Sequence, residues 1–138
     1  MAKLVRFGVS LDDRLLKEFD RHIQRRRYTN RSEALRDLIR NNLVGQEWDE
    51  NKATIGTITF VYDHHVRDLT AKLTDIQHDY QGQILSGMHV HLDHDHCLEV
   101  LVLRGKSKDV RRVADTLIST KGVKHGRLTI TTSGAELK

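Results

Sequence analysis

The order of predicted strands and helices over residues 56–138 restricts the fold of this chain more than any other feature. Alternating or continuous apolar runs predict strands, and apolar residues three to four apart predict helices. In chain order these are a strand at 56–62, a helix at about 65–80, strands at 84–92 and 97–103, a helix at about 108–120 and a strand at 124–131. This order is typical of a four-stranded antiparallel sheet with both helices on one face, a ferredoxin-like α+β fold. We expect Leu101 and Leu103 on the open face, where apolar residues favour assembly with another copy.

The first third of the chain has a different pattern, a strand followed by two helices. Weak alternation over residues 3–11 predicts the strand, and Asp12 with the apolar periodicity after it predicts a capped helix that ends near 25–27. Asn30, with Glu33 three residues later, predicts the N-cap of a second helix. A module this small cannot bury its apolar faces alone, so we expect two copies to pair through their strands.

Charge and periodicity place a boundary between these two parts. Residues 1–48 hold 11 Lys and Arg against 7 Asp and Glu, whereas residues 49–138 hold 12 of each kind. The polar segment 46–55 lacks sustained periodicity and is predicted to be a linker, with Trp48 as a candidate anchor. The expected domains are therefore 1–45, 46–55 and 56–138.

Composition excludes several classes of protein. With 38% hydrophobic and 30% charged residues the chain is expected to be globular, and no apolar run approaches the roughly 18 residues that cross a membrane. A single cysteine excludes an intrachain disulfide, and the N-terminus lacks the apolar stretch of a secretion signal. We expect a cytoplasmic protein without a membrane partner.

The first module resembles the ribbon-helix-helix family of DNA-binding domains. The resemblance rests on residues 6–11 and 28–36, and it implies a dimer whose two-stranded ribbon enters the major groove of operator DNA. Alternation along the strand places Arg6, Gly8 and Ser10 on the outward face. Because Gly8 has no side chain where relatives carry a polar one, fewer bases should be read directly.

The start of the second helix is the expected phosphate contact of this module. Free backbone N–H groups there, together with Arg31 and Ser32, are suited to hold a DNA phosphate. The alternative is that the basic surface is only the solvated face of a dimerisation module.

The most distinctive segment runs from His89 to Cys97 and reads His-Val-His-Leu-Asp-His-Asp-His-Cys. Two residues apart in a strand, His89 and His91 project from the same face. Matching the apolar residues of the two strands pairs 92 with 98 and 90 with 100, around a loop at 94–96. This register predicts that His89, His91, Cys97 and Glu99 all lie on the open face of the sheet.

Two imidazoles and a thiolate suit Ni(II), Cu or Zn better than Mg or Ca. A fourth ligand is needed, and His78 points away from the buried side of its predicted helix. We therefore expect His78 to reach a site on a neighbouring subunit. The remaining histidines of this module, at 64, 65, 94, 96 and 125, are expected to be structural.

Nearly the whole chain resembles the nickel-responsive transcriptional regulators, which join a ribbon-helix-helix domain to an ACT-type metal-binding domain. The motifs that match are Gln77-His78, Met88-His-Val-His91 and Asp93-His-Asp-His-Cys97-Leu-Glu99. The resemblance implies a repressor of nickel uptake, not an enzyme, that forms a homotetramer as a dimer of dimers. It also implies one square-planar Ni(II) per subunit, held by His89, His91 and Cys97 with His78 of another subunit. A plane is the geometry that d⁸ Ni(II) favours with strong-field ligands such as a thiolate.

The same resemblance suggests roles for further residues. Tyr62 and Gln77 match positions near the metal, and we interpret Glu99 as the partner of a ligand imidazole. Arg67 matches a position that meets the DNA backbone. Glu33 and Asp37, one helical turn apart, match a second cation site, although a solvated acidic pair explains them equally well.

Metal binding is expected to act on DNA affinity by ordering the protein. A metal that bridges two subunits through His78 would fix the helix that carries His78 and the preceding loop with Arg67. Because these segments are then already ordered, the protein loses less conformational entropy when DNA binds. One rival is a regulator of the same build that responds to Zn, Cu or a small metabolite. A hydrolytic metalloenzyme fits poorly, because four protein ligands leave no open position for water and no general base stands out.

Overall fold

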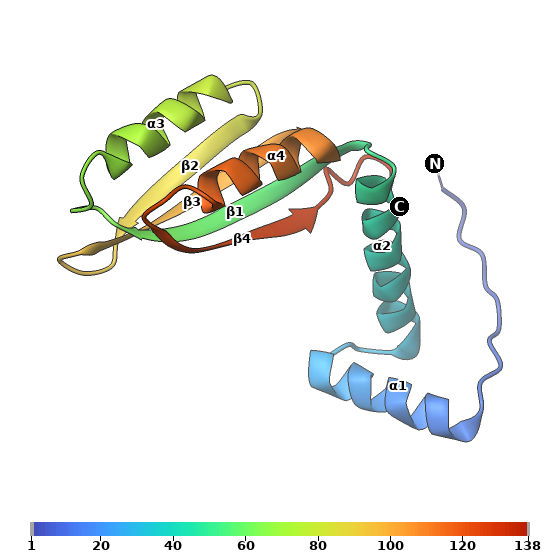
Figure 1. Ribbon diagram of the computed structural model, residues 1–138. Coiled ribbons are helices and arrows are strands. Elements are labelled where there is room, and N and C mark those ends of the chain that lie inside the picture. The colour runs from blue at the N-terminus through green and yellow to red at the C-terminus, as the bar shows by residue number, and fades with distance from the viewer. Residues whose placement is uncertain (1, 138) are drawn as a thin grey trace. The chain divides into compact units, whose positions relative to one another are not determined.

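The computed structural model describes residues 2–137. The chain divides into two compact units, one formed mainly by the residues up to Leu43 and the other by Val44–Ala135 (Figure 1). Within the described residues, no helix is both long and apolar enough to cross a membrane.

The second unit is built on a four-stranded antiparallel sheet with strand order β2-β3-β1-β4. Its elements are β1 (Ala53–Asp63), α3 (Leu69–Asp79), β2 (Ile84–His91), β3 (His96–Lys106), α4 (Ser107–Ile118) and β4 (Val123–Thr131). Both helices lie on one face of the sheet (Figure 1). The predicted ferredoxin-like order is confirmed, and β2, which carries His89 and His91, is an edge strand.

The core of this unit lies between the sheet and the two helices. Alternate residues of β1 are buried there, ending with Phe60 and the 0%-exposed Tyr62. They pack with apolar residues of both helices and of β3, among them Leu69, Leu73, Leu101, Leu103, Val110, Val113 and Leu117. Gly126 of β4 sits against Ile118, where a Cβ atom would come within 2.6 Å of Cγ1.

The face predicted for the hairpin residues was wrong. Leu101 and Leu103 are buried under the helices instead of lying on the open face, and Cys97 is buried with them. The register also differs, because His91 lies opposite Cys97, and His89 lies opposite Glu99. The four residues still share one face, as predicted, but it is the helix-covered face. The hairpin is apolar on both sides, so its own pattern did not decide the face; the large aromatic residues of β1 did.

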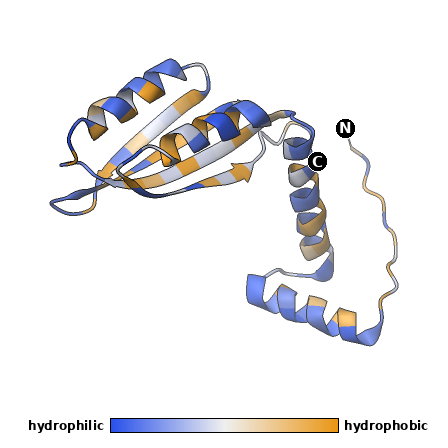
Figure 2. Cartoon of the chain, in the orientation of Figure 1, coloured by the Kyte–Doolittle hydropathy of each residue, from blue (hydrophilic) through white to orange (hydrophobic). Residues whose placement is uncertain are grey.

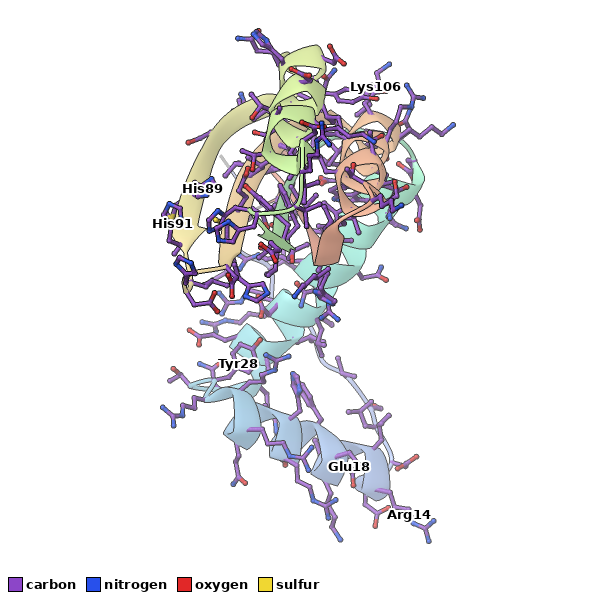
Figure 3. The ribbon with its side chains drawn as sticks, turned by 60° about the vertical axis from the view of Figure 1, so that its left-hand side comes forward. Arg14, Glu18, Tyr28, His89, His91 and Lys106 are labelled. Atoms are coloured by element: carbon purple, nitrogen blue, oxygen red, sulfur yellow. The ribbon has the colours of Figure 1, made fainter. Side chains whose placement is uncertain are left out.

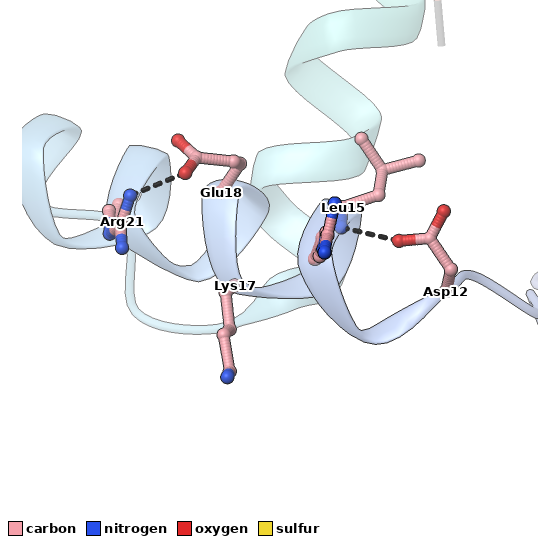
Figure 4. A pocket seen from close by; sticks show the side chains of 6 residues that line it. Asp12, Leu15, Lys17, Glu18 and Arg21 are labelled. Carbon is pink, nitrogen blue, oxygen red and sulfur yellow. Dashed lines mark hydrogen bonds and ion pairs between the residues drawn. The ribbon is translucent and has the colours of Figure 1, made fainter.

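The first unit contains α1 (Asp13–Arg26) and the beginning of α2 (Arg31–Asp49). Both predicted caps are present: Asp12 accepts a hydrogen bond from the Leu15 N–H at 2.8 Å (Figure 4), and Asn30 accepts one from the Glu33 N–H at 2.9 Å. The strand predicted at 3–11 is not formed, since residues 2–12 are neither helix nor strand in the single chain. A strand exists only where a neighbouring strand accepts and donates its backbone hydrogen bonds, and one copy offers none here.

Apolar side chains of the first unit remain exposed. Leu4, Phe7 and Val9 are exposed by 84%, 70% and 58%, and α1 has no buried residue. Apolar and polar residues alternate along the N-terminal segment in Figure 2. The alternation that predicted a strand is therefore present, but nothing within one chain covers its apolar side.

Two predicted boundaries also need correction. The segment 46–55 is not irregular, because α2 continues to Asp49 and β1 begins at Ala53. Trp48 explains this order: its ring is buried, and its Nε1 donates a hydrogen bond to the Thr131 carbonyl at 2.8 Å. The helix predicted from about 65 begins only at Leu69, after a series of turns in which Asp68 adopts a left-handed backbone conformation.

Candidate metal centre

Cys97 and His91 lie side by side where β2 and β3 meet at the hairpin. The Cys97 Sγ is 3.4 Å from the His91 Nδ1, and the two residues are direct partners across the strands. Burial, followed by the nearby carboxylates of Glu99, Asp63 and Asp93, raises the pKa of the Cys97 thiol. A bound divalent cation would act in the opposite direction and stabilise the thiolate.

His89 adds a second imidazole to this pair. Its ring centroid is 5.2 Å from that of His91, and 42% of its side chain is exposed. Figure 3 shows the two histidines next to one another on β2, at the edge of the sheet. The exposed imidazoles of His89 and His91 therefore lie side by side at this edge, but His89 is not among the residues whose ligand atoms lie within 4.8 Å of the buried Cys97 sulfur.

Glu99 is held beside these residues by two donors. The Tyr62 hydroxyl donates to its Oε1 at 2.6 Å, and the Gln77 amide donates to its Oε2 at 3.0 Å. Oε1 also lies 3.5 Å from the His89 Nδ1. A carboxylate fixed in this way can orient an imidazole so that its other nitrogen is free to bind a metal. Burial and the Glu99 contact raise the pKa of Tyr62, which keeps the hydroxyl protonated as a donor.

His78 is not brought to this cluster within one chain. It lies in the last turn of α3 and is exposed, next to Gln77, which does contact Glu99. Among the described residues, the group within ligand reach of Cys97 contains His91 and His64 instead.

His64 is a residue that sequence reasoning missed. Its imidazole nitrogen, the His91 nitrogen and the Cys97 sulfur all lie within 4.8 Å of one another. The end of β1 causes this proximity, because Tyr62 pairs with Cys97 and Asp63 pairs with His96. A prediction of the β1–β3 register, in addition to the hairpin register, would have placed His64 here.

The residues predicted to contact DNA are exposed. Arg6, Gly8 and Ser10 lie in the irregular N-terminal segment, and no atom lies within 4 Å of where a Gly8 Cβ would be. Ser32 is exposed in the first turn of α2. Arg67 is 95% exposed, in the turns before α3.

Arg31 is engaged within its own unit. Its Nε and Nη2 donate to the two carboxylate oxygens of Asp20, both at 3.0 Å, which ties α2 to α1. The guanidinium lowers the pKa of Asp20, mainly through this hydrogen bond. A phosphate contact by Arg31 would therefore share or replace an existing pair.

The acidic residues Glu33 and Asp37 lie on the same side of α2, around a hollow that Tyr28, Arg36 and Arg40 also line. The Tyr28 hydroxyl donates to the Asp37 carboxylate, so Asp37 has a protein partner. That hydrogen bond raises the pKa of Tyr28.

Comparison with known proteins covers both units. Residues 55–131 match the NikR C terminal nickel binding domain, and residues 5–44 match the ribbon-helix-helix protein, copG family. A nickel-responsive regulator of Solibacter usitatus (strain Ellin6076) is 65% identical over 139 residues, with 100% of both chains covered. One from Geobacter sp. (strain M21) is 59% identical over 138 residues, with 99% of both chains covered.

A solved structure supports the architecture of the second unit. An uncharacterized protein from Thermotoga maritima aligns with 59% of this chain and 100% of its own, with a TM-score of 0.53 and 13% identity. At that identity the likeness concerns the fold alone. The matches to both domains and the full-length relatives show that this chain belongs to the family of nickel-responsive regulators, with a ribbon-helix-helix domain followed by a nickel-binding domain.

Proposed function

We propose that this chain is a nickel-dependent DNA-binding repressor of nickel uptake, in which Ni(II) is held between subunits. The proposed ligands are His89, His91 and Cys97 of one copy and His78 of another, with one ion per subunit. The observation that carries the proposal is the 3.4 Å approach of the Cys97 sulfur to the His91 nitrogen, with His89 on the same strand face. When bound, Ni(II) supplies a preference for a square plane of such strong-field donors.

The edge position of the donors supports a ligand from a second copy. The corrected face turns Cys97 toward the helices, yet His89 and His91 remain exposed on the edge strand β2. Exposed on α3, His78 has no role in its own cluster. A second copy whose α3 approaches this edge would complete the set of four.

Glu99 has the role of a positioning residue in this scheme. Its contacts with Tyr62 and Gln77 fix the carboxylate before any metal binds. It then holds the His89 ring through Nδ1. Because Gln77 precedes His78 in α3, this network also ties the metal-binding strands to the helix that carries the fourth ligand.

The first unit supports pairing of two copies and DNA binding. Its exposed apolar side chains need a cover that one chain does not supply, and a twin strand beside residues 3–11 would give it. The ribbon formed in this way would present Arg6 and Ser10 to base edges, with Ser32 and Arg31 near the phosphates. Two such dimers on one metal-binding core make the proposed homotetramer, which acts on operator DNA in the cytoplasm.

The turns before α3 connect the metal-binding residues to DNA affinity. Arg67 lies in these turns, one residue before the left-handed Asp68 and two before α3 begins. Fixing α3 through His78 would restrict these turns and the direction of Arg67. The conformational entropy of these turns is then lost when the metal binds and not when DNA binds. Allosteric couplings between two binding events amount to about 1–3 kcal/mol.

We assign Glu33 and Asp37 to a second cation site as part of the same proposal. Their shared position on α2 supports this, and Tyr28 orients the Asp37 carboxylate.

A second arrangement of the nickel ligands is favoured by one specific observation. His64 lies within ligand reach of His91 and Cys97, so three donors of one chain could hold the ion without a partner. In that arrangement His78 would be dispensable. The two arrangements make opposite predictions for substitution of His78 and of His64.

The test of the proposed function is a gel-shift titration of promoter DNA from nickel-transport genes, with and without each divalent ion. We expect Ni(II) to tighten binding about 5- to 150-fold, the range of ordinary allosteric couplings. Wild-type protein should show thiolate-to-nickel charge-transfer absorbance, and His89→Ala or Cys97→Ala should abolish both this absorbance and the gain in affinity. Equal DNA affinity with and without Ni(II) would overturn the proposal, and a gain with Zn(II) or Cu(II) alone would reassign the metal.

A further inference from the structure

A second group of potential ligands lies where the turn after β1 meets the loop between β2 and β3. It consists of His65, His94 and Asp95, whose nitrogen and oxygen atoms all lie within 4.8 Å of one another. All three residues are exposed, and the His65 Nε2 is 3.5 Å from the Asp95 Oδ1. The group shares no residue with the nickel ligands proposed above.

The two segments that carry these residues are held by carboxylate–backbone hydrogen bonds. Asp63 accepts from the His65 N–H at 2.8 Å, and Asp93 accepts from the Asp95 N–H at 2.8 Å. These same bonds are the main cause that lowers the pKa of Asp63 and of Asp93. The backbone N–H of His64 donates to the Asp95 carbonyl at 3.0 Å, which joins the two segments. The ligand-bearing backbone is therefore positioned before any ion arrives.

The imidazoles converge on one point instead of spreading into solvent. The His65 Nε2 is 3.1 Å from the His94 carbonyl oxygen, and the His65 and His94 ring centroids are 5.2 Å apart. The His65 Nε2 already contacts the His94 carbonyl oxygen and the Asp95 carboxylate, so these contacts hold the ring beside the other two residues. A bound ion would take the place of these contacts at the nitrogen.

The local charge also favours a cation. Three carboxylates, those of Asp63, Asp93 and Asp95, belong to these two turns. Lys124 brings a positive charge close to them: its Nζ is 2.7 Å from the His96 Nε2, and its charge contributes to the lowered pKa of Asp63. Carboxylates outnumber ammonium groups at the cluster, so a divalent ion lowers its electrostatic energy.

We propose that His65, His94 and Asp95 form a second transition-metal site that binds a zinc-class divalent ion within a single chain. Two imidazoles and one carboxylate are typical zinc ligands, and ligand atoms on one such ion lie about 3–4 Å apart. Small rotations of the exposed side chains would close the observed spacing to that range. Three protein ligands leave the remaining coordination positions to water.

The test is zinc titration of the full-length chain by calorimetry, in a His89→Ala/Cys97→Ala background that removes the proposed nickel ligands. We expect the double variant to bind zinc. The triple variant that also carries His65→Ala should bind one zinc equivalent fewer per chain. His94→Ala should have the same effect. His125→Ala is the matched control, because it removes an exposed histidine of β4 outside the cluster.

A second measurement uses the native ligand set. Wild-type protein loaded with one Ni(II) per chain should take up a further zinc equivalent without change in its thiolate charge-transfer absorbance, and His65→Ala should not. Equal zinc stoichiometry in His65→Ala and His125→Ala would overturn the second site. Because the charge-transfer absorbance reports on the nickel site that contains Cys97 and the zinc stoichiometry reports on His65 and His94, failure of the proposed function and failure of this inference give different results.

Discussion

The two units of this molecule obtain their stability in different ways. The unit of residues 44–135 buries an aromatic and aliphatic core between its sheet and its helices, with Phe60, Tyr62 and Leu117 almost completely covered. The unit up to Leu43 leaves Phe7 and Val9 exposed, and only Ala34 is buried among its described residues. The unit of residues 44–135 carries its own core, whereas the unit up to Leu43 leaves apolar side chains uncovered, which we propose another copy of the chain covers.

This difference matches the division of tasks that we propose. A metal site needs donors held within a fraction of an ångström, which a rigid sheet and its hydrogen-bonded carboxylate provide. A DNA-binding ribbon needs two strands related by symmetry, which a single chain cannot provide. Substitutions that affect one unit and spare the other test the comparison most sharply.

The largest effect is expected from a charge in the apolar side of the N-terminal segment. Phe7→Asp would place a carboxylate where a twin copy should cover the residue, and burying an unpaired charge is strongly unfavourable. We expect DNA affinity to fall by at least about 100-fold, with nickel absorbance unchanged. Fluorescence anisotropy with operator DNA measures the affinity, sedimentation measures the pairing of two copies, and Phe7→Leu is the control. Full DNA affinity in Phe7→Asp would show that this segment needs no partner.

The core of the second unit should be sensitive to truncation by itself. Phe60→Ala removes a ring that is 1% exposed, and truncations of this kind cost about 3–5 kcal/mol. We expect the free energy of unfolding of the 44–135 unit to fall by that amount, independently of protein concentration. Chemical denaturation at two protein concentrations measures it. A loss below about 1 kcal/mol would contradict a core contained within one chain.

Two glycines give a matched pair across the units. A Cβ at Gly126 would lie 2.6 Å from the Ile118 Cγ1 and 3.2 Å from the Phe60 Cβ, whereas a Cβ at Gly8 meets nothing within 4 Å. We expect Gly126→Ala to destabilise the second unit by about 1–3 kcal/mol. Gly8→Ala should leave the midpoint of thermal unfolding unchanged. A larger destabilisation by Gly8→Ala than by Gly126→Ala would contradict the packing described here.

The smallest effect concerns the exposed ion pair that ties α1 to α2. Arg31 lowers the pKa of Asp20 in the folded chain, so the pair stabilises the fold above the ordinary carboxyl pKa of 3.8 and this contribution is lost as pH falls through the lowered value. Asp20→Asn should therefore reduce helix stability slightly at pH 7 and not at all at about pH 2. Circular dichroism melts at both pH values measure this. A difference that persists at pH 2 would assign the effect to something other than the charge.

The sequence was sufficient for the order of elements, because strand alternation, helix periodicity and the caps at Asp12 and Asn30 are local signals. It also grouped His89, His91, Cys97 and Glu99 on one face, since residue parity survived the error in register. It did not identify the face, because β3 is apolar on both sides and the decision came from Phe60 and Tyr62, distant in sequence.

The surroundings of the metal ligands were the least predictable part. His64, His65 and His94 meet only because the end of β1 pairs with the beginning of β3, a long-range register that no local pattern contains. Trp48 likewise orders a segment that local composition predicted to be a linker, through packing and a hydrogen bond to Thr131. Tertiary contacts decided these cases.

Shared coordination of nickel by two copies is the central claim, and subunit complementation tests it directly. The two variants are His78→Ala, which keeps the strand donors, and Cys97→Ala, which keeps His78. We predict that neither alone shows the thiolate-to-nickel absorbance at one Ni(II) per chain, and that mixing them with subunit exchange restores part of it. Full absorbance in His78→Ala alone, lost on addition of His64→Ala, would contradict the claim and place the ion within a single chain.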